Sequence, residues 1–223
     1  MRVLTLDVET SLREPWLELG PDGKPTFAPL PLHRVEIACW LVAENGSTEM
    51  RFYDRAVDED SVDGCLGLKR LAADLRAADR LVTWNGRGFD MPLLSLHALA
   101  EGLDWGWWET RRHRFPNYKT PLWHFDMQDQ LSDYGAARGL SLDRVARLLG
   151  LGKQGMHGAD VGAYLERGER VQVMAYCMND VLITYLIYLR WSATHGGAAA
   201  ALDAYERALT WAKQHSVLGS FYP

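Results

Sequence analysis

Four acidic residues and one tyrosine stand at positions from which their side chains could act together on a phosphate ester. Asp7 and Glu9 form a D-x-E pair near the N-terminus, and Asp90 stands alone in the first half of the chain. Tyr176 precedes Asp180 by four residues. Carboxylates gathered at one spot repel one another unless cations lie between them. Two hard divalent cations about 3.5–4 Å apart favour such oxygen ligands and promote phosphoryl transfer, so the pattern suggests metal-dependent hydrolysis of a phosphate ester.

Asp7 and Glu9 need a strand to hold them, and residues 2–8 have the pattern of one. The run RVLTLDV is rich in apolar and β-branched residues that alternate with polar ones, which predicts a strand. The two-residue period of a strand places both acids on one face, near its C-terminal end. A solvated strand end is the alternative interpretation of a D-x-E pair.

Asp90 lies at a predicted junction between a strand and a helix. The apolar run of residues 81–84 predicts a buried strand. A turn follows at Asn85, Gly86 and Gly88, and an apolar-periodic helix then starts. An acid in the first turn of a helix is stabilised by unpaired backbone N–H groups. A helix cap is therefore the alternative to a chemical role for this residue.

Tyr176 and Asp180 fall within the longest predicted helix, residues 169–191. Apolar residues recur there with the helical period. The four-residue spacing places the two side chains one turn apart on the same face. The alternative is an ordinary side-chain pair at the flank of the helix.

The rest of the chain predicts strands and helices around these positions. Strands at residues 35–43 and 48–53 are joined by an Asn45-Gly46 turn, which is a strong hairpin signal. The proline-rich loop of residues 15–31 is either a flexible insertion or a cover for a site. Helices are also expected at residues 61–78, 141–149, 161–166 and 198–215, with a short tail after the last.

Another buried strand is predicted at residues 122–127. The alternation of the strand places His124 and Asp126 on one face. A structural hydrogen-bonded pair is the favoured interpretation of these side chains, and a contact with metal or substrate is the alternative.

The segment Trp105 to Lys119, WGWWETRRHRFPNYK, places aromatic residues between cations. Surfaces that stack bases and contact phosphates use this combination. Arg111, Arg112 and Arg114 are therefore candidates for substrate binding. In the alternative interpretation the large aromatic side chains pack on the core and the arginines are solvated.

Composition and charge limit the classes of partner. The chain has 223 residues, of which 48% are hydrophobic and 24% charged, and its formal net charge is −5. We expect a single domain over residues 1–223, with a C-terminal helix and tail from about residue 197. The negative net charge argues against binding of nucleic acid through a positive potential over the whole protein surface. A nucleic acid would be bound locally, or with a protein partner that supplies it.

The sequence has no pattern typical of a membrane or secreted protein. No apolar run approaches the ~20 residues of a membrane span, and the N-terminus MRVLTLDVETS lacks a signal-peptide pattern. Cys39, Cys65 and Cys177 lie far apart without a CxxC pair, which fits a reducing compartment. We therefore expect a cytoplasmic protein without a membrane partner, whose cysteines are small core residues.

Three segments, in this order, resemble the motifs of a known family. LTLDVET resembles its first exonuclease motif, TWNGRGFDMPLL its second, and YCMNDVLITYLIYLRW its third, in the Tyr-x-x-x-Asp form. PLPLHRVEIACW, the strand with His124 and Asp126, and SLDRVARLLGL are also similar. On these residues the chain resembles the DEDD (DEDDy-type) 3′–5′ exonucleases of the ribonuclease H-like superfamily. The similarity is to the stand-alone branch related to the proofreading domain of family-B DNA polymerases.

The resemblance implies a fold and a set of metal ligands. The fold would be α/β and ribonuclease H-like, with a five-stranded mixed sheet of three antiparallel strands followed by two parallel ones, flanked by helices. Two divalent ions, Mg²⁺ or Mn²⁺, would be bound. Asp7 would bridge both ions, and Glu9 and Asp180 would hold the one that carries the attacking water. Asp90 would serve the second ion, largely through water, and Tyr176 would orient the attacking water.

The resemblance also implies a substrate and a reaction. Asn85 and Phe89 would lie along the substrate strand, with Phe89 near the terminal sugar or base. The activity would be removal of nucleotides from the 3′ end of single-stranded DNA, as in DNA repair. An enzyme that trims RNA or short oligonucleotides is one alternative, since discrimination at the 2′-OH depends on pocket shape. A non-catalytic nucleic-acid-binding module on the same fold and a small-molecule phosphoesterase are the others.

Overall fold

A five-stranded mixed sheet forms the centre of the computed structural model, which describes residues 1–23, 26–58, 66–111, 123–152 and 156–215. The strand order is β3-β2-β1-β4-β5. β1 (Val3–Leu12), β2 (His33–Glu44) and β3 (Ser47–Asp54) are antiparallel neighbours. β4 (Arg80–Thr83) and β5 (His124–Asp126) continue the sheet in parallel with β1. The expected sheet, three antiparallel strands followed by two parallel ones, is confirmed.

Local signals in the sequence account for most element boundaries. Asn45 and Gly46 have φ of 50° and 82°, the left-handed pair that a two-residue hairpin needs, and they join β2 to β3 as predicted. The Ser141 hydroxyl caps α6 (Leu142–Leu148) by accepting from the Arg144 N–H, and Gly150 follows at φ 71°. The predicted helix at residues 61–78 is described as α2 (Leu66–Ala77), because residues 59–65 lie outside the described part.

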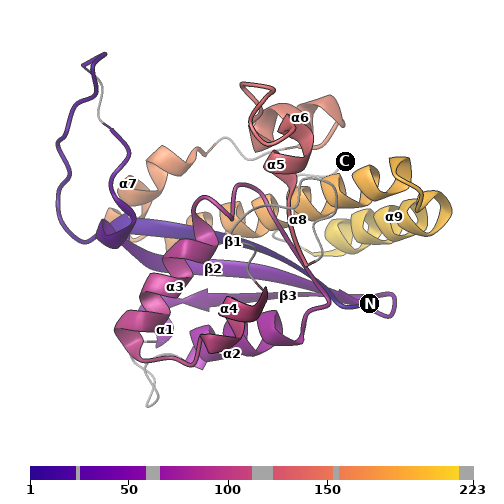
Figure 1. The fold of residues 1–223 in the computed structure, drawn as a ribbon, viewed down its shortest axis with the longest axis horizontal. Helices are drawn as coiled ribbons and strands as arrows, with labels where there is room; N and C mark the ends of the chain where they lie inside the picture. Colours follow the sequence, from indigo (N-terminus) through magenta and orange to yellow (C-terminus); the bar gives the residue numbers. More distant parts are fainter. Residues whose placement is uncertain (24–25, 59–65, 112–122, 153–155, 216–223) are drawn as a thin grey trace.

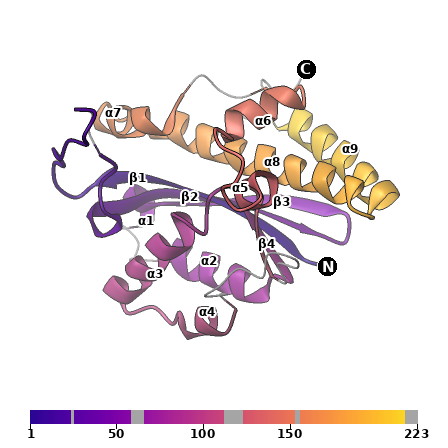
Figure 2. The same cartoon turned by 45° about the horizontal axis from the view of Figure 1, so that its top comes forward.

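Helices cover both faces of the sheet (Figures 1 and 2). On one face the sheet packs with α8 (Arg170–Thr194), α9 (Ala198–Gln214), α6 and α7 (Val161–Glu166) around one apolar cluster. On the other face α2, α3 (Asp90–Glu101) and α4 (Gly106–Arg111) build a second cluster. The shorter elements are η1 (Leu30–Leu32), α1 (Arg55–Asp58), α5 (Met127–Ser132) and η2 (Gly158–Asp160).

α8 is the longest helix described and lies along the sheet (Figure 2). Val173, Cys177, Val181 and Leu182 are fully buried, because the helix is sandwiched between the sheet and α9. By length and composition α8 is apolar enough to cross a membrane, but 72% of its most apolar window is buried inside the fold. Such burial is typical of the core helix of a folded domain.

A network of ion pairs anchors the first turn of α8 to the sheet. The Arg170 guanidinium donates to the Glu36 carboxylate and to the Glu36 backbone carbonyl, each at 3.0 Å. It also donates to the carboxylate of Asp54 at the end of β3. Burial raises the pKa of Glu36, but bonds from Ser11, Arg170 and Arg55 outweigh it and hold the pKa below its ordinary value. The start of α8 is thereby fixed to two strands, six residues before Tyr176.

Removal of this anchor should destabilise the whole fold. We expect Arg170→Ala to lower the free energy of unfolding by about 3 kcal/mol, because the change removes the guanidinium that Asp54 and Glu36 share and leaves Glu36 with only Arg34 and Arg55 among its described ion pairs. Urea unfolding would measure the difference. Arg167→Ala is the matched control: its exposed guanidinium pairs with Glu169, two residues away, and lies over the nearby Tyr164 ring, so a change within about 0.5 kcal/mol is expected. Equal losses in both variants would contradict the proposed anchoring role.

Candidate active site

Asp7 and Glu9 lie inside β1, not at its end. β1 continues to Leu12, four residues beyond the predicted end at Val8. The prediction stopped too early because the polar run from Glu9 to Ser11 breaks the apolar alternation, whereas pairing with β2 holds those residues in the strand. The register shifts between Glu9 and Thr10, as in a β-bulge. The two acids share one face, as predicted, and Glu9 is only 8% exposed.

Asp90 is the first residue of α3 and is 4% exposed. It does not cap the helix through its side chain, because the N-cap position is Phe89 and no side-chain cap bond forms there. Its Oδ1 is buried without a hydrogen-bond partner among the described residues. A buried carboxylate oxygen in this state is costly unless a cation or water meets it. The alternative role of Asp90 as a helix cap is therefore wrong.

Asp126 positions the turn that carries Asp90. Its carboxylate accepts from the backbone N–H groups of Asn85 and Arg87, each at 2.9 Å, and also caps α5. Neighbouring His124 shares a 2.8 Å hydrogen bond with the Thr83 hydroxyl. Both side chains thus make structural hydrogen bonds, His124 to the end of β4 and Asp126 to the turn that follows it. The role of Asp126 in holding residues 85–87 was missed, because nothing in the sequence marks which backbone groups a carboxylate will meet.

The glycines in this turn are required by close packing. A Cβ on Gly86 would lie 2.5 Å from the Thr83 Cβ, and one on Gly88 would lie 2.8 Å from the Asn85 Oδ1. Asn85 itself has φ 60°, a left-handed conformation that asparagine tolerates better than most residues. These constraints place Asp90 directly after β4.

α8 brings Tyr176, Cys177 and Asp180 to the face of β1 that carries Asp7 and Glu9. The Tyr176 hydroxyl hydrogen-bonds the carboxylate of Asp180, as the four-residue spacing predicted. Tyr176 and Asp180 are each 5% exposed, and Cys177 is fully buried. The Cys177 thiol donates to the Asp7 backbone carbonyl at 3.4 Å. Sequence reasoning missed the position of Cys177 at the site, although it stands three residues before Asp180 on the same helix face.

The four carboxylates converge closely enough to repel one another. Burial raises the pKa of Glu9 well above its ordinary value, and the charges of Asp7, Asp180 and Asp90 raise it further. Burial and the charge of Asp7 likewise raise the pKa of Asp90. The donor set is rich in hard carboxylate oxygens, and one of them, Asp90 Oδ1, has no hydrogen-bond partner within the described part of the chain. Residues of this kind fit divalent cations such as Mg²⁺ or Mn²⁺.

Aromatic rings adjoin the carboxylates. Phe27 stacks on His33 with ring centroids 4.9 Å apart and meets Phe89, the residue before Asp90, edge-on at 5.5 Å. His33 also bonds the hydroxyl of Thr10, the residue after Glu9. Phe27 is 72% exposed and belongs to the loop between β1 and β2, the indigo arm that projects from the sheet in Figure 1. No signal in the sequence singled out this phenylalanine.

The aromatic residues of the predicted stacking segment mostly face the core. Trp108 is 7% exposed, and Trp105 and Trp107 pack against the cluster under α3. Trp108 is thus a core residue, and Trp105 and Trp107 are partly buried against the same cluster, as the alternative interpretation expected. Arg111 ends α4, and Arg112 and Arg114 lie outside the described residues. Their role in substrate binding stays a prediction.

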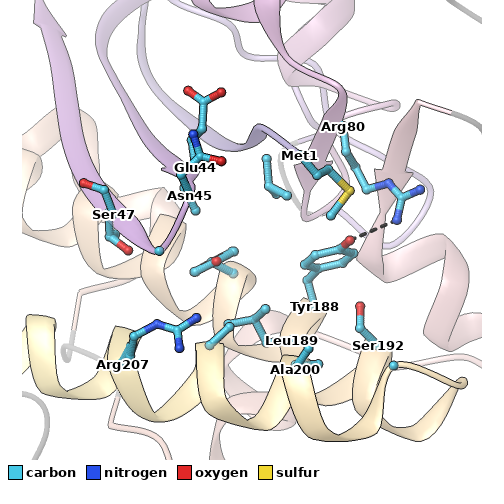
Figure 3. Close-up of a pocket in the computed structure, with 18 of the residues that line it drawn as sticks. Met1, Glu44, Asn45, Ser47, Arg80, Tyr188, Leu189, Ser192, Ala200 and Arg207 are labelled. Atoms are coloured by element: carbon cyan, nitrogen blue, oxygen red, sulfur yellow. Dashed lines mark hydrogen bonds between the residues drawn. The ribbon is translucent and has the colours of Figure 1, made fainter.

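A cavity of about 430 Å³ opens at the other end of the sheet (Figure 3). It lies between the start of β1, the β2–β3 turn, α8 and α9, and its lining includes Arg80, Tyr188 and Arg207. Arg80 donates a 3.0 Å hydrogen bond to the Tyr188 hydroxyl (Figure 3). None of the four converging carboxylates lines this cavity. The candidate metal site therefore lies away from this cavity, where β1, α3 and α8 meet.

The repulsion between the carboxylates predicts that neutralising one of them stabilises the fold, by an amount that depends on pH. In the folded chain the pKa of Glu9 lies above its ordinary value of 4.5. Its contribution to stability is thus full below about pH 4.5 and is lost as pH rises toward the raised pKa, since the unfolded chain ionises more readily. In metal-free buffer, Glu9→Gln should raise the melting temperature more at pH 8 than at pH 5, by about 2–4 °C for each kcal/mol regained.

Thermal unfolding with and without Mn²⁺ tests the prediction for the metal-free and for the metal-bound protein. Mn²⁺ should stabilise the wild type and have little effect on Glu9→Gln, because a bound ligand stabilises only the state that binds it. Glu101→Gln, at the exposed end of α3, is the control and should show neither effect. A metal-free Glu9→Gln variant that melts below the wild type at pH 8 would contradict the argument.

Comparison with protein families identifies the family of the chain. Residues 25–216 match the model of a family described as predicted 3′–5′ exonucleases related to the exonuclease domain of PolB. The matched range contains Asp90, Tyr176 and Asp180, and the fold adds Asp7 and Glu9 from β1. No curated protein matched the chain. The chain therefore belongs to the family of predicted 3′–5′ exonucleases related to the exonuclease domain of PolB.

Proposed function

We propose that the chain hydrolyses phosphodiester bonds at the 3′ end of single-stranded DNA with the help of two divalent metal ions. One observation carries this proposal: Asp7, Glu9, Asp90 and Asp180, from three separate elements, act on one another electrostatically within one buried site. A folded chain tolerates such a cluster when cations bind to it. The family match supplies the reaction class, exonucleolytic hydrolysis.

The carboxylates would hold the metal ions. Two Mg²⁺ or Mn²⁺ ions, when bound, would stabilise the charge that develops on the attacking and leaving oxygens of the phosphate. We assign Asp7 to both ions, Glu9 and Asp180 to one, and Asp90 to the other. Elements that are themselves fixed hold all four acids: β1 is paired on both edges, α8 is anchored at Arg170, and the turn before Asp90 is held by Asp126.

Tyr176 would orient the attacking water and would not remove its proton. Burial and the charges of Asp180 and Glu9 raise the pKa of Tyr176, so its hydroxyl stays protonated at neutral pH. A protonated phenol donates one hydrogen bond, here to Asp180, and its oxygen can accept one from water. This arrangement supports a positioning contribution to catalysis.

The substrate strand would lie against the turn before Asp90 and the rings beside it. Asn85 is exposed on that turn, and Phe89 and Phe27 form an edge-on aromatic pair. The exposed ring of Phe27 and the half-buried ring of Phe89 suit the stacking of terminal bases, which tolerates any base sequence. Trimming of RNA is the second candidate function, since the same carboxylates would act on a ribose-containing strand.

An end-labelled substrate tests the activity directly. A 5′-labelled single-stranded DNA and its RNA counterpart would be incubated with Mg²⁺ or Mn²⁺ and resolved on a sequencing gel. The wild type should give a ladder that shortens from the 3′ end, and Asp7→Asn should lower the rate by at least about 100-fold, because it removes the ligand assigned to both ions. Preference for DNA over RNA appears as the ratio of the two rates.

Loss of the activity must be separated from loss of the fold. Asp143→Asn, on α6, where the half-buried carboxylate pairs with the exposed Arg147, is the control and should retain the wild-type rate. Products from an Asp7→Asn protein at more than a tenth of the wild-type rate would rule out the assignment of this acid. Binding without hydrolysis in the wild type, with either metal and either sugar, would favour a binding module.

Tyr176→Phe separates positioning from metal binding. The variant should lower kcat by about 10–100-fold, because the attacking water loses an oriented partner. The affinity for Mn²⁺, measured by titration calorimetry, should stay within about threefold of the wild type. Unchanged kcat would remove the tyrosine from the reaction, and a large loss of Mn²⁺ affinity would make its role structural.

The exposed ring of Phe27 should contribute to binding of the strand. Phe27→Ala should raise KM for single-stranded DNA by about fivefold or more with a smaller effect on kcat, because stacking contributes about 1–3 kcal/mol per base. Phe52→Ala is the matched control, since Phe52 is 50% exposed on β3, at the edge of the sheet. Equal KM values for the two variants would exclude Phe27 from substrate binding.

A further inference from the structure

Two buried cysteines meet beneath the carboxylates. Cys39 on β2 is the register partner of Asp7 on β1, and Cys177 follows Tyr176 on α8. Both are free and fully buried, as expected of small core residues. The Cys39 thiol donates to the Met174 carbonyl at 3.9 Å and the Cys177 thiol to the Asp7 carbonyl at 3.4 Å, and the two thiols are close enough to interact. The sheet and the helix thus place sulfur directly beside the oxygen ligands proposed for catalysis.

One of these thiols lies within coordinating reach of two acids. The Cys177 Sγ and one carboxylate oxygen each from Asp7 and Glu9 are all within 4.8 Å of one another. Zinc–ligand bonds of about 2.0–2.3 Å place the donors of a tetrahedral site about 3.3–3.8 Å apart. Small side-chain rotations would therefore close this triad on one ion. The nearby carboxylate of Asp90, with an oxygen that has no partner, adds to the attraction for a cation.

The donor set differs from a pure oxygen site in the metals it selects. Mg²⁺ and Mn²⁺ favour oxygen ligands, and they gain little from a thiol. Zn²⁺ and Cd²⁺ bind thiolate strongly and accept carboxylate ligands in the same site. A site with two carboxylates and one cysteine therefore discriminates between a hard cation and a thiophilic one.

We propose that Asp7, Glu9 and Cys177 form a binding site for a thiophilic divalent cation, Zn²⁺ in particular, that overlaps the place of a catalytic metal. On binding, the Cys177 S–H bond breaks, a metal–sulfur bond forms, and the proton passes to the buffer. No electron is transferred. Bound Zn²⁺ would pull the two carboxylates toward the thiolate and exclude the hard ion. The binding itself stands apart from the proposed function, and only the resulting inhibition rests on it.

Cadmium titration of the full metal-free chain tests the site without any nuclease assay. A Cd²⁺–thiolate bond has an ultraviolet charge-transfer band, which reports sulfur ligation directly. The titration would use a Cys65→Ala background, so that only Cys39 and Cys177 can respond. We expect a band that saturates at one Cd²⁺ per chain and is competed by Zn²⁺ but not by equal Mg²⁺.

Three variants identify the ligands. Cys177→Ser should abolish the band, whereas Cys39→Ala should retain it, because Cys39 contacts the other thiol and is not within the triad. Asp7→Asn should weaken Cd²⁺ binding by about tenfold or more. Circular dichroism and thermal unfolding report whether each variant remains folded. A band that survives Cys177→Ser, or that depends on Cys39 alone, would overturn the proposal, as would a folded wild type without any band.

The inhibition experiment links the site to the reaction. The Zn²⁺ concentration that halves Mg²⁺-supported hydrolysis should rise about tenfold or more in Cys177→Ser, each variant being compared with its own activity without zinc. Hydrolysis that is absent throughout, with the cadmium band present, would reject the proposed function and leave the metal site intact. Hydrolysis equally sensitive to zinc in both proteins would reject the overlap of the two sites.

Discussion

The mutual repulsion of four carboxylates in one buried site is the constraint on which this structure depends. Burial and like charges raise the pKa of Glu9 and of Asp90, so the folded chain is held against a force that tends to separate β1, α3 and α8. Each of these elements has its own restraint. β1 is paired on both edges, the ion pairs of Arg170 fix α8 to β2 and β3, and Asp126 holds the turn before α3.

The two faces of β1 present different side chains to the helices that cover them. The odd-numbered side chains of the first half of β1, which end in Asp7 and Glu9, face α8, and the even-numbered ones face α2 and α3. Asp90 begins α3, after the turn that follows β4, and β4 is the parallel neighbour of β1 in the sheet. The site therefore forms where the sheet, α3 and α8 meet, and the cores on both sides keep their apolar packing.

Burial of large apolar surface also decides which aromatic residues remain accessible. Trp105, Trp107 and Trp108 cover the cluster beneath α3, although the cations around them suggested a stacking surface. Phe27 stays exposed, because the loop between β1 and β2 carries it beyond the ends of the strands (Figure 1). Burial of small apolar side chains also places Cys39 and Cys177 beneath the carboxylates. Their spacing in the sequence did not indicate that their sulfur atoms would lie near possible metal ligands.

The sequence alone was sufficient for the order of the five strands, for the longer helices and for the hairpin turn at Asn45 and Gly46, whereas the short helices α1, α4 and α5 were not predicted. The predicted features follow from local periodicity, turn chemistry and motifs, which depend on neighbours in the chain. The end of β1 could not be predicted from β1 alone. Pairing with β2 keeps in the strand the polar residues that the apolar alternation had left out of the prediction.

Only the tertiary structure decided the bonds from Asp126 to the turn, the contact of Phe27 with Phe89, and the place of Cys177 beside Asp7. Each of these joins residues far apart in the sequence. Such contacts are set by how helices pack on a twisted sheet, which no local pattern encodes.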